Sequence, residues 1–138
     1  MNTELVVVKG KVIEQSKSFT AEVGEDIGYE AGAKMIKRYF DQNNDDVLAF
    51  FLGRNIIESI LAQPGVAGIR MFNAINDNGI RQLVLVGADN KGNNILQYTA
   101  INTEGQLEKK KGIVADRAKV CPPICGDSDT GGEDLSWY

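Results

Sequence analysis

The chain has 138 residues and a formal net charge of −4, and it contains no histidine. Without histidine it lacks the commonest general base, and no serine–histidine or cysteine–histidine nucleophile pair can form within it. The acidic balance argues against general affinity for nucleic acid. Apolar residues make up 43% and charged residues 25%, which is typical of a globular protein with one core.

Two apolar runs bear on the compartment, and both are short. Residues 5–8 are too few for the apolar part of a signal peptide, and Val47–Leu52 is too short to span a bilayer. We therefore expect a cytoplasmic protein with no membrane insertion. In that compartment the two cysteines are expected to be reduced thiols rather than a structural disulfide.

The first part of the chain changes from a strand pattern to a helix pattern. Residues 5–8 and 11–13 predict one strand interrupted at Gly10, or two short strands. The alternation of Phe19, Ala21 and Val23 with polar residues predicts a half-buried strand. Apolar residues at helical spacing then predict an amphipathic helix over about residues 29–42, with Gly28 as its N-cap.

A second helix is expected after a polar connector. The apolar run Val47–Leu52 indicates either a buried strand or the entry to that helix. Residues 54–63 place four apolar side chains on one stripe, and Pro64-Gly65 ends the pattern.

Three β-rich runs follow, joined by turns that contain glycine. Gly79, Gly92 and Gly105 are spaced thirteen residues apart, which suits the strand-plus-turn units of a β-meander. We expect strands 68–75, 81–88 and 95–101 to be antiparallel neighbours in that order. Residues 83–86 show no polar alternation, so the middle strand should be covered on both faces.

These elements predict an α+β fold: a mainly antiparallel meander sheet of about five strands with two helices packed on one face. We expect residues 1–126 to form a single domain. Residues 127–138 contain four acidic residues and no lysine or arginine, which predicts a flexible acidic tail.

Cys121 and Cys125 enclose two prolines and form the sharpest local feature. They could supply half of a zinc site completed by a second subunit, act as a regulatory dithiol, or flank a rigid proline turn as buried or unpaired thiols. The spacing is neither a redox motif nor followed by a second ligand pair. We predict no metal site and no cofactor.

Arginines and aromatic residues supply the remaining candidates. Arg70 lies within a predicted strand and could clamp an anion together with Arg54, although ordinary ion pairing with Asp89, Asp116 or Glu58 is the favoured explanation. Trp137 and Tyr138 follow the acidic run and could act as a docking peptide or pack back on the domain.

The chain resembles a group of small uncharacterised bacterial proteins. The resemblance spans about residues 28–126 and is most specific at the Cys-Pro-Pro-x-Cys-Gly sequence of residues 121–126. It also rests on Gly53-Arg54, Leu61–Gly65, Gly68–Arg70, Asp77–Gly79 and Leu83–Asp89. No activity is attached to this group, so the resemblance implies no catalytic residue and no ligand.

For function, the sequence favours a non-catalytic binding or assembly module whose partner is another protein or a second copy of the chain. The alternative is a small thiol-dependent enzyme or redox sensor that uses Cys121 or Cys125. No catalytic residue is predicted.

Overall fold

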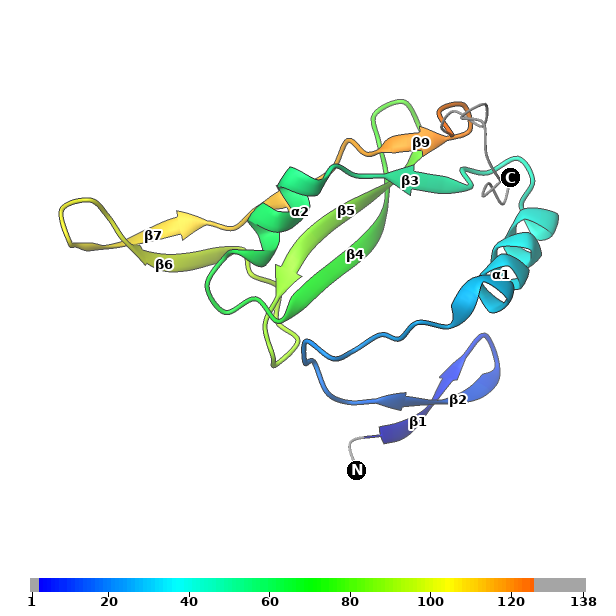
Figure 1. Ribbon diagram of the computed structural model, residues 1–138, viewed down its shortest axis with the longest axis horizontal. Helices are drawn as coiled ribbons and strands as arrows, with labels where there is room; N and C mark the ends of the chain where they lie inside the picture. The colour runs from blue at the N-terminus through cyan, green and yellow to red at the C-terminus, as the bar shows by residue number, and fades with distance from the viewer. Residues whose placement is uncertain (1–2, 126–138) are drawn as a thin grey trace.

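The computed structural model describes residues 3–125, and Figure 1 shows an α+β chain in which every strand pair is antiparallel. The elements are β1 (Thr3–Val8), β2 (Lys11–Ser16), α1 (Gly28–Gln42), β3 (Ala49–Phe51), α2 (Arg54–Leu61), β4 (Gly68–Ile75), β5 (Arg81–Ala88), β6 (Gln97–Ile101), β7 (Leu107–Lys111), β8 (Val114–Ala115) and β9 (Lys119–Cys121). The predicted fold class and both helices are confirmed. The strands form four small sheets, so the prediction of a single five-stranded meander is wrong.

The core lies at the three-stranded sheet β4-β5-β8, where α2 covers one face. Ile60 of α2 is fully buried against Leu85 and Ala115. Leu85 and Val86 are successive residues of β5, which point to opposite faces, and both are buried. The predicted central and doubly covered position of residues 81–88 is therefore confirmed.

The turns at residues 76–80, 89–93 and 102–106 have one common geometry, which explains the thirteen-residue spacing. In each turn the first residue, Asn76, Asp89 or Asn102, accepts two backbone N–H bonds through its side-chain oxygen. The glycine at the fourth position has a φ near +80° in all three, a conformation that other residues adopt only with strain. The sequence therefore predicted the turns correctly.

The strand that follows the second turn does not join the sheet as predicted. Only a bridge between Ala88 and Asn94 and a hydrogen bond from Ile95 N to Gly87 O (2.8 Å) continue the pairing. The chain then leaves, and β6 pairs with β7 while β8 takes the place beside β5. Gly112 allows this crossing, because a Cβ atom there would lie 2.1 Å from the carbonyl oxygen of Ile95.

The two helices differ in how they are held. Helix α2 contributes Ile60 to the core, but no residue of α1 is buried, so the prediction that both helices pack on one face is wrong for α1. In Figure 1, α1 lies to one side of the sheet. Residues 17–27 contain no strand, which corrects the interpretation of the Phe19–Val23 alternation.

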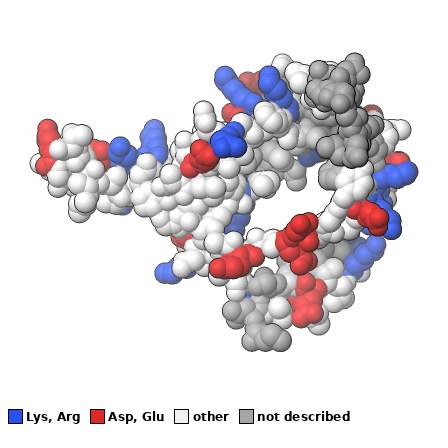
Figure 2. Space-filling view, in the orientation of Figure 1, with Lys and Arg blue, Asp and Glu red and all other residues white. Residues whose placement is uncertain are grey.

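The molecule has an open outline. Figure 1 shows the β6–β7 hairpin projecting from one side of the sheet, while β1–β2 and α1 lie on the other. An opening separates β4 from the segment before α1 and from α1 itself, and Figure 2 shows the same opening with side chains drawn. Hereafter "the arm" is residues 97–111, and "the opening" is the space between β4 and residues 17–33.

Candidate functional site

Arg70, the first residue predicted to bind an anion, instead donates hydrogen bonds to other residues of the chain. Its Nη1 donates to the carbonyl oxygen of Gly92 at 2.8 Å and to Oδ1 of Asn94 at 2.6 Å. Its guanidinium carbon lies 5.7 Å from the ring centroid of Phe19, which also packs on Gly92. Arg70 thus ties the segment before α1 to the 89–94 turn, and ion pairing with an acidic residue does not explain its position.

Arg54, the second predicted anion ligand, is exposed at the first residue of α2. The hydrogen bonds of Arg70 go to the 89–94 turn instead, and no contact in the described ranges joins the two arginines. An anion site that combines them therefore stays a prediction without a shared geometry.

A cluster around Arg81 was missed at the level of sequence. Arg81 Nε lies 3.3 Å from Oδ2 of Asp46, and its other nitrogens donate to Asn73 Oδ1 (3.1 Å) and to the carbonyl oxygen of Val47 (3.1 Å). The guanidinium carbon also lies 5.0 Å from the ring centroid of Phe50. Asp46 is 35 residues distant along the chain, so no local spacing indicates the pair.

Tyr39 brings α1 into this cluster. Its hydroxyl donates to Asp46, and this hydrogen bond is the main cause that lowers the pKa of Asp46 and raises the pKa of Tyr39. Arg81 Nη2 in turn donates to the Tyr39 hydroxyl at 3.3 Å. The groups of this cluster satisfy one another, which makes the cluster a joint between α1 and the sheet rather than a ligand site.

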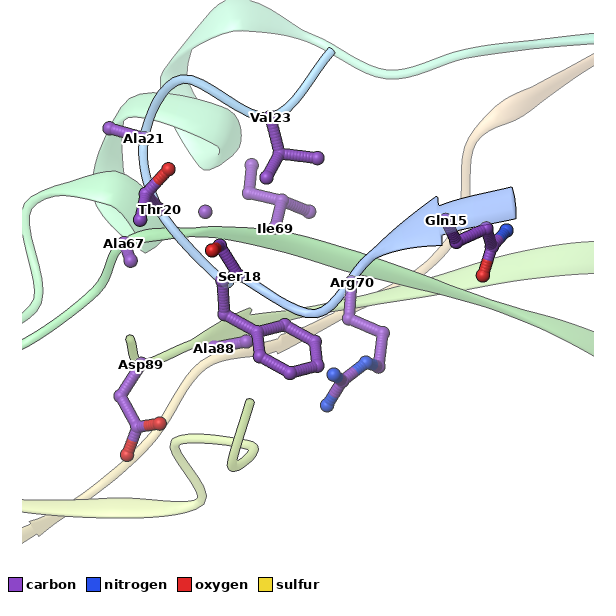
Figure 3. A pocket seen from close by; sticks show the side chains of 12 residues that line it. Gln15, Ser18, Thr20, Ala21, Val23, Ala67, Ile69, Arg70, Ala88 and Asp89 are labelled. Carbon is purple, nitrogen blue, oxygen red and sulfur yellow. The ribbon is translucent and has the colours of Figure 1, made fainter. Parts of the chain in front are cut away.

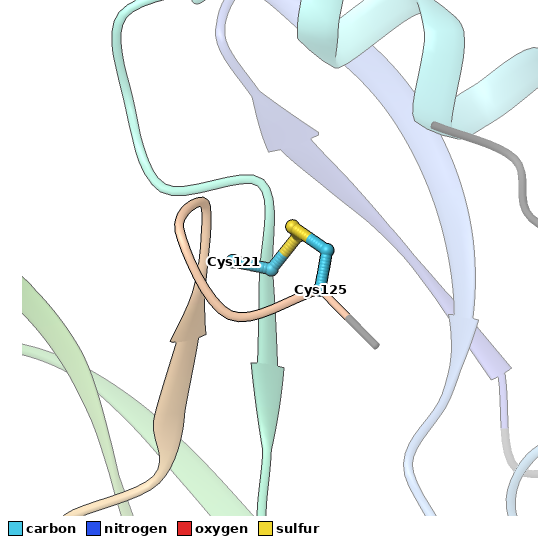
Figure 4. Close-up of a disulfide and its surroundings, with 2 residues drawn as sticks. All are labelled: Cys121 and Cys125. Carbon is cyan, nitrogen blue, oxygen red and sulfur yellow. A yellow bond between two sulfur atoms is a disulfide. The ribbon is translucent and has the colours of Figure 1, made fainter. Parts of the chain in front are cut away.

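Cys121 and Cys125 form a disulfide, with their Cα atoms 4.7 Å apart (Figure 4). The expectation of reduced thiols is therefore corrected. The separation along the chain is four residues, and the turn between them brings both Cα atoms within the range that a disulfide spans. Cys121 is buried at the end of β9, beside Ala49 of β3. In this state neither cysteine offers a thiolate for catalysis or for a metal.

A hollow of about 510 Å³ lies where residues 18–23 cross the beginning of β4. Figure 3 shows Val23 and Ile69 beside it, with the Arg70 guanidinium and the Asp89 carboxylate farther along the wall. Asp89 is the first residue of the 89–93 turn, and its hydrogen bonds from the backbone of that turn lower its pKa. The charged groups around the hollow are therefore committed to structure.

The free edge of β4 is the main unsatisfied feature of the described residues. The bond from Asn76 N to Ile80 O fixes the strand alternation, so the N–H and C=O groups of Ile69, Met71, Asn73 and Ile75 point away from β5. No backbone hydrogen bond of residues 3–125 reaches these groups. Met71 and Ile75 are 62% and 75% exposed, and residues 71–75 contain neither proline nor lysine, which are common protections of strand edges.

Both hairpins outside the core also expose apolar side chains. Leu5, Val7 and Val12 share one face of β1–β2 and are 64–72% exposed. On the arm, Ile101 and Leu107 are opposite each other and are 70% and 75% exposed. Two-stranded hairpins of this kind are marginally stable alone in water.

The remaining predictions concern the C-terminal residues, membrane insertion and metal binding. Trp137 and Tyr138 lie beyond the residues that the structure describes, as does the predicted tail. Across residues 3–125, no helix is long and apolar enough to cross a bilayer, and no cluster of three potential metal ligands occurs.

Comparison with known proteins gives no information on the function of this chain. No family model, no curated protein and no solved structure matches it. The resemblance to small bacterial proteins stays a prediction, and the residues brought together by the fold are the evidence for function.

Proposed function

We propose that the chain is a non-catalytic binding or assembly module that acts by joining its exposed strands to another protein chain. The observation that carries the proposal is the accessible surface of 11120 Å². A compact monomer of this size exposes only about 7,000 Å². Residues 1–2 and 126–138 could add at most roughly 2,400 Å² as an extended chain, so at least roughly 1,700 Å² of the difference belongs to the described part.

The excess is large enough to form an interface. A stable protein–protein interface buries about 800 Å² on each partner. The β4 edge and the apolar faces of the two hairpins are the surfaces that would gain most from such burial, because backbone pairing and apolar contact are both available there. A partner strand therefore fits this surface better than a small ligand does.

Small-angle scattering combined with native mass measurement tests the proposal. A compact chain of this length has a radius of gyration of about 14 Å. We expect either a mass above that of one chain, or a single chain with a clearly larger radius. A monomer at about 14 Å would show that the chain buries its own apolar surface, and the proposal would be wrong.

The alternative function, a redox sensor at Cys121 and Cys125, is favoured by the disulfide alone. It requires that reduction changes the surface that the partner uses. The disulfide is typical of an oxidising compartment, so it argues against the cytoplasmic location that we expected from the sequence. Comparing the partner affinity of the oxidised protein with that of the Cys121→Ser/Cys125→Ser variant tests this alternative. Equal affinities would exclude the sensor.

A further inference from the structure

We infer that the partner is a second copy of this chain, whose arm inserts into the opening of the first. This inference rests on the proposed function and names its partner. The projecting element and the receiving space are both present in one chain, on opposite sides of the β4–β5 sheet (Figure 1). Within one copy the arm lies on the far side of the sheet from the opening, so it is a second copy that can supply an arm to it.

The two sides of the opening differ in chemistry. On one side lies the β4 edge, where residues 71–75 are uncharged and the backbone is unpaired. On the other side run residues 17–33, which carry Glu22, Glu25, Asp26 and Glu30 and a single cation, Lys17, that is paired with Glu4 at 3.5 Å. Figure 2 shows acidic side chains gathered along this rim. An occupant that has an uncharged strand on one side and basic residues on the other would therefore be complementary to the opening.

The arm has these two edges. Its β6 strand, Gln97–Ile101, is uncharged, whereas β7 carries Lys109 and Lys111 on one face and Lys110 with Glu108 on the other, a net positive charge. The bond from Asn102 N to Gln106 O fixes the alternation, so the backbone groups of Gln97, Thr99 and Ile101 point away from β7. These groups have no backbone partner within the described residues.

The fit places β6 of one copy against β4 of the other and the lysines of β7 against the acidic rim. Strand addition would satisfy the outward groups of both edges. Of the three lysines, only Lys110 has an ion pair in residues 3–125, with Glu108 of its own arm at 3.7 Å. The apolar side chains of Ile101 and Leu107 would leave water in the same step.

Charge reversal on each side supplies the main test. The arm variant is Lys109→Glu/Lys110→Glu/Lys111→Glu, and the rim variant is Glu22→Lys/Glu25→Lys/Glu30→Lys. Asp26 is left intact because its side chain accepts the backbone N–H of Gly28 at the start of α1. We expect the unmodified chain to self-associate in sedimentation velocity and each variant alone to associate on the order of tenfold more weakly.

Mixing the two variants separates this contact from other interfaces. The rim variant has a basic arm and a basic rim, and the arm variant has an acidic arm and an acidic rim. In a 1:1 mixture each arm therefore meets a rim of opposite charge on the other variant, and the mixture should give heterodimers. A chain with all six changes has an acidic arm and a basic rim. Its arm and rim are again opposite in charge, so it should recover self-association. Recovery in both samples requires that arm and rim meet between copies.

The backbone side of the contact has its own test. In Met71→Pro the lost N–H is one that points away from β5, so the β4–β5 pairing keeps its bonds while the outer edge is blocked. Met71→Ala is the matched control, because it removes the same side chain and keeps the N–H. Weaker association of Met71→Pro than of Met71→Ala, at similar melting temperature, supports strand addition.

Three results would overturn the inference. If the pure chain stays monomeric at every concentration but has a radius well above about 14 Å, the partner is a different protein, and only the proposed function survives. If the arm variant weakens association and the rim variant does not, the lysines bind another acidic segment, such as residues 127–138. If neither variant has an effect, the copies meet through another surface.

Discussion

The buried centre and the arm are built from the same parts and end in opposite environments. The β4–β5 hairpin and the β6–β7 hairpin share one turn geometry, with an asparagine oxygen that accepts two backbone N–H bonds and a glycine at positive φ. Yet Leu85 of β5 is 5% exposed, whereas Leu107 of β7 is 75% exposed. The turn residues form both hairpins, and the packing of α2 and β8 against β4–β5 makes only that hairpin part of the core.

This difference separates what stabilises the fold from what is available for binding. The cluster of Ile60, Leu85 and Ala115 removes apolar surface from water within one chain. The arm keeps the same kind of surface exposed, at a strand edge and next to lysines. An exposed apolar surface of this kind indicates a binding site, and the proposed contact would cover it.

The largest expected effect comes from truncating a leucine in each region. Leu85→Ala removes a buried side chain from the core and should lower the free energy of unfolding by about 2–5 kcal/mol. Leu107→Ala is the matched control on the arm, and it should change the stability of the single chain by no more than about 0.5 kcal/mol. Urea unfolding of both variants in dilute protein measures the contrast. Similar losses would mean that the arm belongs to the core.

Much of the fold could be predicted from the sequence because its signals are local. The glycine spacing, the apolar run of residues 83–86 and the helical periodicity of residues 29–42 each arise within one element. The pairing partner of each strand could not be predicted in this way, because it depends on residues far apart in the sequence. Residues 95–101 follow a good turn, but the crossing at Gly112 and the fit of Val114–Ala115 beside β5 decide the pairing, and both lie far along the chain.

The candidate site was harder to predict for the same reason. Arg70 was identified, but its hydrogen-bond acceptors, Gly92 and Asn94, lie 22 and 24 residues away. The cluster of Arg81 with Asp46 depends on how α1 meets the sheet, which no spacing encodes. The free edge of β4 is invisible in the sequence, because a strand becomes an edge only when no other strand pairs with it.

A smaller effect is expected at Gly112, where the arm leaves the buried centre. In Gly112→Ala the new Cβ would meet the backbone oxygen of Ile95 at 2.1 Å, so the crossing must shift. The shift should disturb the bond from Ile95 to Gly87 and cost about 1–3 kcal/mol of stability. Gly68→Ala is the control, because a Cβ at Gly68 meets no atom within 4 Å. Thermal unfolding of both variants checks the prediction, which equal melting temperatures would contradict.

The shared turn allows a direct test of whether the two hairpins unfold together. Asn76→Ala and Asn102→Ala each remove one side-chain oxygen that accepts two backbone N–H groups. We expect Asn76→Ala to cost about 0.5–1.5 kcal/mol in global unfolding, because its hairpin carries the core. In the monomer, Asn102→Ala should instead speed hydrogen exchange only within the arm. A global loss in both variants would show that the arm and the core form one cooperative unit.

The smallest effect is expected at the joint between α1 and the sheet, and it depends on pH. The hydrogen bond from Tyr39 and the nearby Arg81 hold the pKa of Asp46 below its ordinary value of 3.8. A carboxylate with a lowered pKa in the folded state stabilises the fold above the ordinary value, and this contribution disappears as the pH falls through the folded-state pKa. The melting temperature of Asp46→Asn should therefore lie below that of the unmodified chain near neutral pH, and the gap should narrow below about pH 4.

High pH gives the opposite dependence at the same joint. The pKa of Tyr39 is raised above 10.0, chiefly by its hydrogen bond to Asp46, so its contribution is present below that value and is lost as the pH rises through the folded-state pKa. Asp46→Asn removes the negative charge beside Tyr39, which should bring the tyrosine titration, followed by absorbance, closer to its ordinary position. Both side chains of the Arg81–Asp46 pair are about 30% exposed, so salt should screen part of the effect. If Asp46→Asn left both the acid dependence of melting and the tyrosine titration unchanged, α1 would not be held to the sheet through this cluster in solution.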